Sequence, residues 1–595
     1  MLSRAYKLRF RRRFRLQKRQ VGELGAQAER HLENNFFKRL ERLIRVRRFV
    51  LSWLLLMVLL IGVSIAQNRS LSSYYQTPQP IAGGTYIEGM IGTFSNASPI
   101  YATDLVDATV SKLVFSGLLT FNEQNQLVGD LAESYTANDR GTVYTVKLRP
   151  NVTWHDGKPL TADDVVFTYQ VIQNPDANSP LLNSWKGVTV AAVDPLTVTF
   201  TLPNSLASFP YSLTNGIVPK HLLNGVTMAD MRSAAFNTSN PVGTGPFMWQ
   251  AIQVSGGSLD DRQTQVALRA FVQYHRGEPK LSSFVVHSFR NPQALLKAFE
   301  KQELNAVVGF DEVPQQLQDE SGLRRYNMLL AAEVMVFFKN TIPPFTDQKV
   351  RQALVQSIDR TKVMSGLGYS TVPVREPLIR GQLGYNPSFQ QAGYDPANAA
   401  SLLDQAGWTM GPDGVRSKDG VRVMFQLTTQ EGGEYDRLAR ELQQQWRAMG
   451  VEVEIVTVPD GATFQSTLAD HSYDALLYGI SIGPDPDVFV YWHSSQADVL
   501  APVRLNFSEY KSGQADTALD AGRTRADPAL RAIKYIPFLQ AWQADAPAFG
   551  LYQPRVLYIT RQPVFGLTEH TINTDSGRLT NVHNWMIRTT FKTPE

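Results

Sequence analysis

A single run, residues 144–170, sets the strongest limit on the fold because it joins an alternating strand, a turn and a capped helix. Alternate positions from Tyr144 to Leu148 are apolar, which is the period of a strand with one buried face. A turn follows at Gly157, since glycine accepts a positive φ without steric cost. Thr161 then precedes two aspartates and an apolar series, the pattern of a helix N-terminus. We expect the folded part of the chain to be built around this run.

The chain of 595 residues exceeds what one hydrophobic core usually supports, so at least two lobes are expected. The sequence contains no cysteine, which excludes disulfides, thiol catalysis and cysteine zinc sites. The same absence excludes anchoring through a lipid-modified N-terminal cysteine. Attachment to a membrane must therefore use another device.

A transmembrane helix is predicted at residues 49–66, a stretch without a charge that is just long enough for a hydrocarbon core of about 30 Å. The preceding residues 1–48 hold 16 Lys and Arg against 4 Glu, so the positive-inside rule places them in the cytoplasm. We expect a single-pass protein of the cell membrane with its binding domain on the extracellular or periplasmic side. A cleaved signal peptide is the alternative, because Ser64 to Ala66 resembles a cleavage site, although the basic region is long for one.

The basic tail is expected to contact anionic lipid, which attracts each basic residue near the surface by about 1 kcal/mol. Nucleic acid is the alternative partner of a basic run, and the neighbouring membrane span disfavours it. Beyond the span, residues 67–83 are rich in Ser, Gln, Pro and Gly and lack an apolar period. They are predicted to form a flexible linker.

Residues 154–165, WHDGKPLTADDV, resemble the W-x-D-G-x-P-L-T-A-x-D-V signature of the family-5 extracellular solute-binding proteins, the oligopeptide and dipeptide receptors of ABC importers. Similar blocks follow the family's order at 130–135, 347–359 and 394–408. The resemblance covers most of the chain from Gly84 onward. It implies an α/β, two-lobed fold of the type II periplasmic-binding-protein class with an extra subdomain, here preceded by one N-terminal transmembrane helix.

The resemblance also suggests domain boundaries. Residues 84–340 are assigned to lobe 1, with an inserted subdomain at about 120–240, and residues 341–554 are assigned to lobe 2. Residues 555–595 are expected to return to lobe 1. Within lobe 2, the order strand, helix, strand across residues 421–456 predicts a parallel strand pair.

The function that the resemblance implies is capture of a peptide or a related small solute between two lobes, which close on it and deliver it to a permease driven by an ATPase. Neither catalysis nor a cofactor is expected. A tethered peptide-binding sensor or chaperone is one rival function, and a nickel-type receptor is another. None of the nine histidines is spaced i,i+3 or i,i+4 from another, so no sequence-local metal site is visible, and ligands assembled in space stay open. His155 and Asp156 are interpreted as an exposed histidine beside a turn aspartate.

One catalytic motif surrounds Ser481, which stands in a G-x-S-x-G sequence with Asp487, His493 and His570 downstream in hydrolase order. A serine hydrolase of this type needs a helix directly after the serine. The sequence PDPD, beginning at Pro484, follows instead and removes two backbone N–H donors. An extracellular serine hydrolase is therefore a rival that the sequence disfavours.

The ligand site is expected at residues 478–487. Peptide receptors of this family usually place an aspartate a few residues before an Asp-Pro-Asp turn, where it pairs with the peptide α-amino group. Aligning on that turn puts Ser481 or Ile482 at this position. A buried ammonium without a counter-charge is costly, so either Asp485 substitutes or the ligand lacks a free amine, as a sugar or modified peptide does. The predicted lining residues are Tyr478, Ser481, Ile482, Asp485, Asp487, Trp492 and, from the inserted subdomain, Trp185.

Overall fold

The computed structural model describes residues 25, 47–75, 77–258, 260–459, 461–501 and 503–592. The predicted basic tail, residues 1–48, lies outside the described residues apart from Gly25, Arg47 and Arg48. The chain divides into two compact units, residues 1–79 with 589–595, and residues 80–588.

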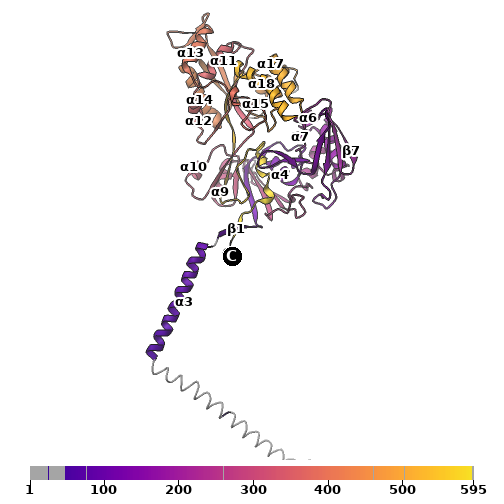
Figure 1. Cartoon of the computed structure of the whole chain (residues 1–595), viewed down its shortest axis with the longest axis vertical. Helices are drawn as coiled ribbons and strands as arrows, with labels where there is room; N and C mark the ends of the chain where they lie inside the picture. Colours follow the sequence, from indigo (N-terminus) through magenta and orange to yellow (C-terminus); the bar gives the residue numbers. More distant parts are fainter. Residues whose placement is uncertain are drawn as a thin grey trace, which may run out of the picture. The chain divides into compact units, whose positions relative to one another are not determined.

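The first unit contains helix α3, Arg47–Tyr75 (Figure 1). Its segment Phe49–Gln67 is long and apolar enough to cross a membrane. The prediction of a flexible linker from residue 67 is wrong over its first part, because the helix continues to Tyr75. No proline or glycine stands between Gly62 and Pro78, so the helix propagates until the residue before that proline is forced out of the helical region. Strand β1, Thr77–Ile81, follows and pairs with β24, Arg588–Lys592.

Lobe 1 of the second unit is built on a seven-stranded sheet with the order β13-β23-β12-β2-β11-β10-β9. Strand β2 is parallel to both β11 and β12, whereas β23 is antiparallel to both of its neighbours. The strands are β2 (Thr85–Ile91), β9 (Phe247–Ser255), β10 (Gln263–Ala270), β11 (Ser283–Phe289), β12 (Ala306–Val308), β13 (Arg324–Leu329) and β23 (Arg555–Thr560). Helices α4 (Leu105–Val114) and α9 (Pro292–Glu300) contact this sheet.

A buried ion pair ties the C-terminal segment into lobe 1. The Arg578 guanidinium contacts the Glu88 carboxylate on β2, and both side chains are completely buried. The Tyr558 hydroxyl on β23 donates to the other Glu88 oxygen over 2.6 Å. This pairing fixes the short helix η7, Asp575–Leu579, against α4.

The inserted subdomain contains the strand, turn and helix predicted at residues 144–170. Strand β6, Val143–Leu148, lies in a four-stranded sheet of order β5-β6-β8-β7. Helix α5, Ala162–Gln173, begins after Thr161 as predicted, and the Asp164 carboxylate accepts the Thr161 backbone N–H over 2.9 Å. The other three strands are β5 (Ala132–Ala137), β7 (Thr189–Asp194) and β8 (Thr197–Thr201).

Lobe 2 has a six-stranded sheet of order β15-β22-β14-β21-β19-β20. The predicted parallel pair is confirmed, because β19 and β20 run parallel on either side of helix α14, Gly433–Ala448, in the sequence. The strands are β14 (Ala332–Phe338), β15 (Val372–Pro373), β19 (Met424–Gln430), β20 (Glu452–Val458), β21 (Ala475–Ser481) and β22 (Ala548–Gln553). Helices of this lobe include α11 (Gln348–Gln356), α13 (Pro396–Gln405), α17 (Gly513–Arg523) and α18 (Pro528–Asp545).

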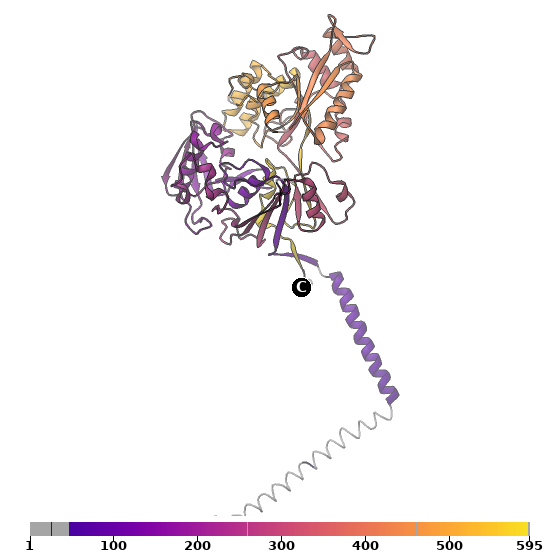
Figure 2. The ribbon, with the colours of Figure 1, turned by 180° about the vertical axis from the view of Figure 1, so that it is seen from behind.

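Two short segments connect the lobes (Figure 2). The first is Leu330–Ala331, between β13 and β14, and the second is Pro554, between β22 and β23. Because β13 pairs with β23 and β14 with β22, the two segments run side by side. The first crossing was expected near residue 340 and lies earlier, since β14 already belongs to the lobe 2 sheet. Strand β14 is buried on both faces, so its residue pattern does not indicate which of the two sheets it joins.

Candidate functional site

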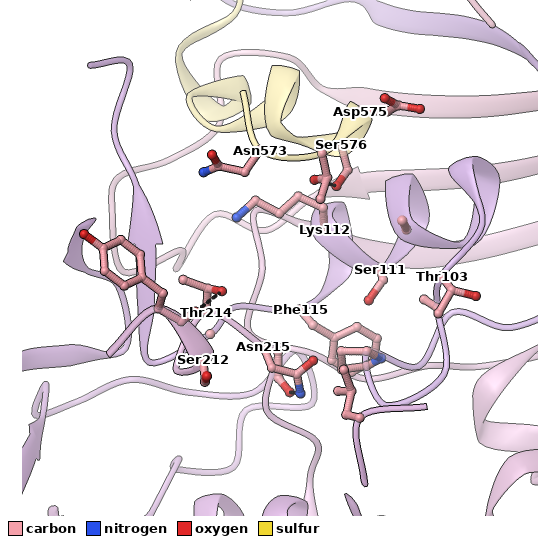
Figure 3. Close-up of a pocket in the computed structure, with 18 of the residues that line it drawn as sticks. Thr103, Ser111, Lys112, Phe115, Ser212, Thr214, Asn215, Asn573, Asp575 and Ser576 are labelled. Atoms are coloured by element: carbon pink, nitrogen blue, oxygen red, sulfur yellow. Dashed lines mark hydrogen bonds between the residues drawn. The ribbon is translucent and has the colours of Figure 1, made fainter. Parts of the chain in front are cut away.

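A cavity of about 710 Å³ lies between the lobes. Lobe 1 contributes α4, residues 211–216 and the segment 573–576. The first crossing segment contributes Leu330, and strand β14 contributes Ala332. The volume falls in the range of roughly 300–1,000 Å³ that small-molecule sites occupy. The walls combine apolar side chains, such as Leu105, Phe115 and Leu181, with polar ones. Figure 3 shows hydroxyl and amide side chains from separate segments around the space, including Ser111, Ser212, Thr214, Asn215, Asn573 and Ser576.

A second cavity of about 320 Å³ adjoins the first. Lys112, Tyr211, Thr214 and Asn573 line both cavities, so the two form one continuous cleft. Asn573 also exchanges two hydrogen bonds with Asn125, of 2.8 and 3.1 Å, beside the second cavity.

Two charged side chains from the described residues line the larger cavity, Lys112 and Asp575. The Lys112 ammonium donates to the Thr120 hydroxyl over 3.0 Å, and burial lowers the pKa of Lys112. Burial raises the pKa of Asp575, and the nearby Arg578 guanidinium opposes that change. In Figure 3 the Lys112 side chain extends toward the space between Asn573 and Thr214, whereas the Asp575 carboxylate points away from it.

The predicted lining residues are only partly brought together. Ser481 and Trp185 line the larger cavity. Trp185 is only 2% exposed and packs on Tyr169 at a ring distance of 4.0 Å, so most of its surface belongs to the subdomain core. Tyr478 lines a separate cavity of about 380 Å³ within lobe 2, which shares Ser481 with the interlobe cleft.

Four predicted lining residues do not line the interlobe cavities of this structure. The Ile482 side chain is buried in the lobe 2 core, and its N–H donates to the Ala331 carbonyl over 3.0 Å. Trp492 is completely buried against Trp542 and Phe337. Full burial in the core removes the apolar surface of these side chains from water.

Asp485 and Asp487 are engaged by arginines. The Asp485 carboxylate accepts two hydrogen bonds from Arg531 on α18, each of 2.8 Å, in a buried bidentate pair. In this structure the Asp485 carboxylate, considered as a substitute amine anchor, is therefore occupied by Arg531. Asp487 accepts from Arg523 over 3.2 Å and from Ser208 over 3.1 Å. Both carboxylates avoid the cost of an unpaired buried charge in this way.

The geometry does not assemble a serine hydrolase. In the described part of the chain, no hydrogen bond joins Ser481 to a histidine. His493 instead contacts Ser495 over 2.8 Å, and the His570 Nδ1 contacts the Thr568 carbonyl over 2.9 Å. Ser481 ends strand β21, and no helix begins directly after it. A base within hydrogen-bond reach of the nucleophile is thus missing from the residues that the structure describes.

The signature block has a structural role. The expectation that His155 is exposed is wrong, because only 9% of its surface is accessible. Its Nε2 contacts the Gly245 carbonyl over 3.0 Å, and its Nδ1 accepts the Gly243 N–H over 3.2 Å. The Asp156 carboxylate contacts His221 over 2.7 Å. The block therefore fixes the loop at residues 243–245.

The most informative residue that sequence reasoning missed is Lys112. It is the one basic residue in the helix at residues 105–114, and that charge among apolar neighbours was the available signal. The loops at 211–216 and 573–576 carry no motif, because their contribution depends on backbone placement rather than on residue spacing.

Two α/β lobes joined by two adjacent crossings, with a cleft between them, define a two-lobed solute-binding protein of the type II periplasmic class. The model of the bacterial extracellular solute-binding proteins, family 5, matches residues 126–500, which is more than half of the chain. The chain belongs to this family, and it is a binding protein rather than an enzyme.

Several known proteins are similar over most of the chain. The oligopeptide-binding protein AppA of Bacillus subtilis is 28% identical over 532 residues, covering 84% of this chain and 92% of AppA. The AppA structure with a nonapeptide has a TM-score of 0.67 at 26% identity and covers 86% of this chain and 100% of that one. NikZ of Campylobacter jejuni, in complex with Ni(L-His), has a TM-score of 0.70 at 26% identity, covering 84% and 99%. MoaA of A. tumefaciens R10, in complex with mannopinic acid, has a TM-score of 0.64 at 26% identity, covering 86% and 100%.

Proposed function

We propose that this protein is the membrane-anchored substrate-binding subunit of an ABC importer. It captures a peptide or a related small solute in the interlobe cleft and delivers it to a permease that an ATPase drives. The observation that carries this proposal is the cleft of about 710 Å³ bounded by two lobes that are joined by two adjacent crossings. Such crossings allow hinge closure around a ligand. Family membership supports the transport role.

Helix α3 supplies the anchor in this proposal. Its segment Phe49–Gln67 meets the length and composition of a membrane span, and the basic residues before it favour a cytoplasmic N-terminus. The binding domain then lies on the extracellular or periplasmic side, and the basic tail faces anionic lipid.

The ligand class is narrower than the family alone suggests. AppA is named for oligopeptides, and the NikZ and MoaA structures hold Ni(L-His) and mannopinic acid, so similar folds accept different solutes. In the described residues the cavity lining carries hydroxyls and amides but no cluster of histidines, cysteines and carboxylates suited to a metal ion. These side chains suit a polar organic ligand.

The test is identification of the ligand that accompanies the full-length protein through purification from membranes. Mass spectrometry of the released small molecules should show one solute, which cells lacking the protein should fail to accumulate. Restoration of uptake should require the permease and the ATPase. Ligand binding without any effect on uptake would favour a tethered sensor instead, and the absence of both would reject the proposal.

A further inference from the structure

We propose that the ligand carries a carboxylate group that is received by Lys112 at the junction of the two interlobe cavities. This inference rests on the proposed function, because it names the chemical class of the solute that the cleft captures. It adds one determinant of specificity to a cleft whose other lining groups are mostly uncharged.

The first argument is the state of the Lys112 ammonium. It has three N–H donors, and its one hydrogen bond within the described residues goes to Thr120 Oγ1 over 3.0 Å. No carboxylate of the described residues lies within 4.0 Å of it, whereas the buried Arg578 pairs with Glu88 and the Arg149 guanidinium donates to the Asp130 carbonyl. A partly buried ammonium with donors to spare gains much from an incoming anion.

The second argument is location. Lys112 lines both cavities, so a group bound there lies where the two spaces meet. The lysine stands in the last turn of α4, Leu105–Val114, where the negative end of the helix dipole favours the charged form. Figure 3 shows its ammonium directed into the open space between Asn573 and Thr214, whose polar groups can share the same anion.

The third argument is the surrounding charge. The nearest acidic groups either have another partner or point away from the Lys112 ammonium. Asp130 is buried and contacts His275 over 2.8 Å. The Asp575 carboxylate points away from Lys112 and interacts electrostatically with Arg578. Among the described residues no carboxylate contacts the ammonium directly: Asp130 acts on it only at longer range, and Arg276 adds positive charge nearby. An acidic ligand group fits this field, whereas an ammonium group placed there would be repelled.

The rest of the lining suits the remainder of such a ligand. Hydroxyls and amides at Ser111, Asn215 and Ser576 can bond neutral polar groups such as peptide units or sugar hydroxyls. Two sources share the proposed chemistry, namely the C-terminal carboxylate of a peptide and the carboxylate of a sugar acid. The experiment separates them.

The test uses calorimetric titration of the full-length protein in detergent, freed of carried ligand. The probes are matched pairs: tri- to pentaalanine as free acids and as C-terminal amides, and gluconate with the neutral alditol sorbitol. The preferred free acid should bind roughly tenfold more tightly than its neutral partner or better, as expected for a charged hydrogen bond. The Lys112→Met variant should lose this preference, and Lys112→Arg should retain it.

Lys297→Met is the matched control, because it removes the same charge from an exposed position of α9. It should keep the wild-type preference, and thermal unfolding should show that the Lys112 variants remain folded. Equal affinity of wild type for both members of a pair, or an acid preference that survives Lys112→Met, would overturn the inference while leaving the transport proposal standing. If wild type binds no probe and carries no solute through purification, both proposals fall.

Discussion

The Ser208 hydroxyl, in the inserted subdomain, donates a hydrogen bond to Asp487 Oδ2 of lobe 2 over 3.1 Å. Two further bonds join the same parts of the chain, from the Ala207 N–H to the Arg523 carbonyl over 2.8 Å and from the Ser205 hydroxyl to the Thr524 carbonyl over 3.0 Å. The lobes are thus held by a second connection besides the crossing segments. We expect this latch, the three hydrogen bonds from residues 205–208 to lobe 2, to favour closure of the lobes before a ligand arrives.

Substitution of Ser208→Ala should weaken the latch without disturbing either core. The closed, binding-competent arrangement should become less populated, so the apparent Kd should rise, by up to about tenfold if one hydrogen bond to a charged group is lost. Small-angle scattering should report a larger radius of gyration for the ligand-free variant than for wild type. The control is Ser239→Ala, an exposed serine of lobe 1. A radius and a Kd that both match wild type would show that the latch does not bias closure.

The buried pair of Asp485 and Arg531 makes a different prediction. Loss of one partner leaves an uncompensated charge, so Asp485→Ala should lower the free energy of unfolding by about 3–5 kcal/mol. The double variant Asp485→Ala with Arg531→Leu should recover much of that loss. Urea unfolding of the three proteins measures it. A stable Asp485→Ala protein that fails to bind ligands with a free amine would instead restore Asp485 as an amine anchor.

Acid should destabilise the protein through His155. Burial lowers the pKa of His155 to about 4, whereas an unfolded histidine titrates near 6.5. Between these values the unfolded chain binds a proton that the folded chain does not, so the free energy of unfolding falls as the pH falls, by about 3 kcal/mol at the lower limit. The geometry gives the reason, since protonation at Nδ1 would set two donors against each other at Gly243.

A His155→Gln variant can retain both contacts and cannot titrate, so its stability should vary less between pH 6.5 and 4. Denaturant unfolding across this range tests the expectation. Some acid sensitivity should persist, because burial also lowers the pKa values of His287 and His583 to about 4. An unchanged pH profile in His155→Gln would show that His155 does not contribute.

Helix α3 should remain in the mature protein. It continues without interruption from Arg47 to Tyr75, through the residues that a signal peptidase would have to cleave in an extended form. Membrane fractions should hold the full-length chain, and alkaline carbonate should not release it. A mature N-terminus at Gln67 in the culture medium would contradict this prediction.

Sequence reasoning succeeded where short-range chemistry determines structure. Thr161 caps α5 because its neighbours supply the partners, and β19 and β20 are parallel because the connecting helix demands it. It failed where partners come from distant segments. No residue near Asp485 in the sequence indicates that its carboxylate pairs with Arg531. That pairing decides whether the carboxylate can reach a ligand. Lys112 lines the cleft because of the way helix α4 packs in lobe 1. The residue pattern alone does not predict which way the helix faces.

The position of the last two long strands has a consequence for how the protein is made. Strand β22 lies between β15 and β14, and β23 lies between β13 and β12, so each occupies an interior place in its sheet. Neither lobe can complete its hydrogen bonding until residues 548–560 have been synthesised. A chain emerging across a membrane therefore stays unfinished in both lobes almost to its end, which suits passage as an extended polypeptide. Completion then occurs in both lobes together, and a truncation before residue 548 should leave neither lobe folded.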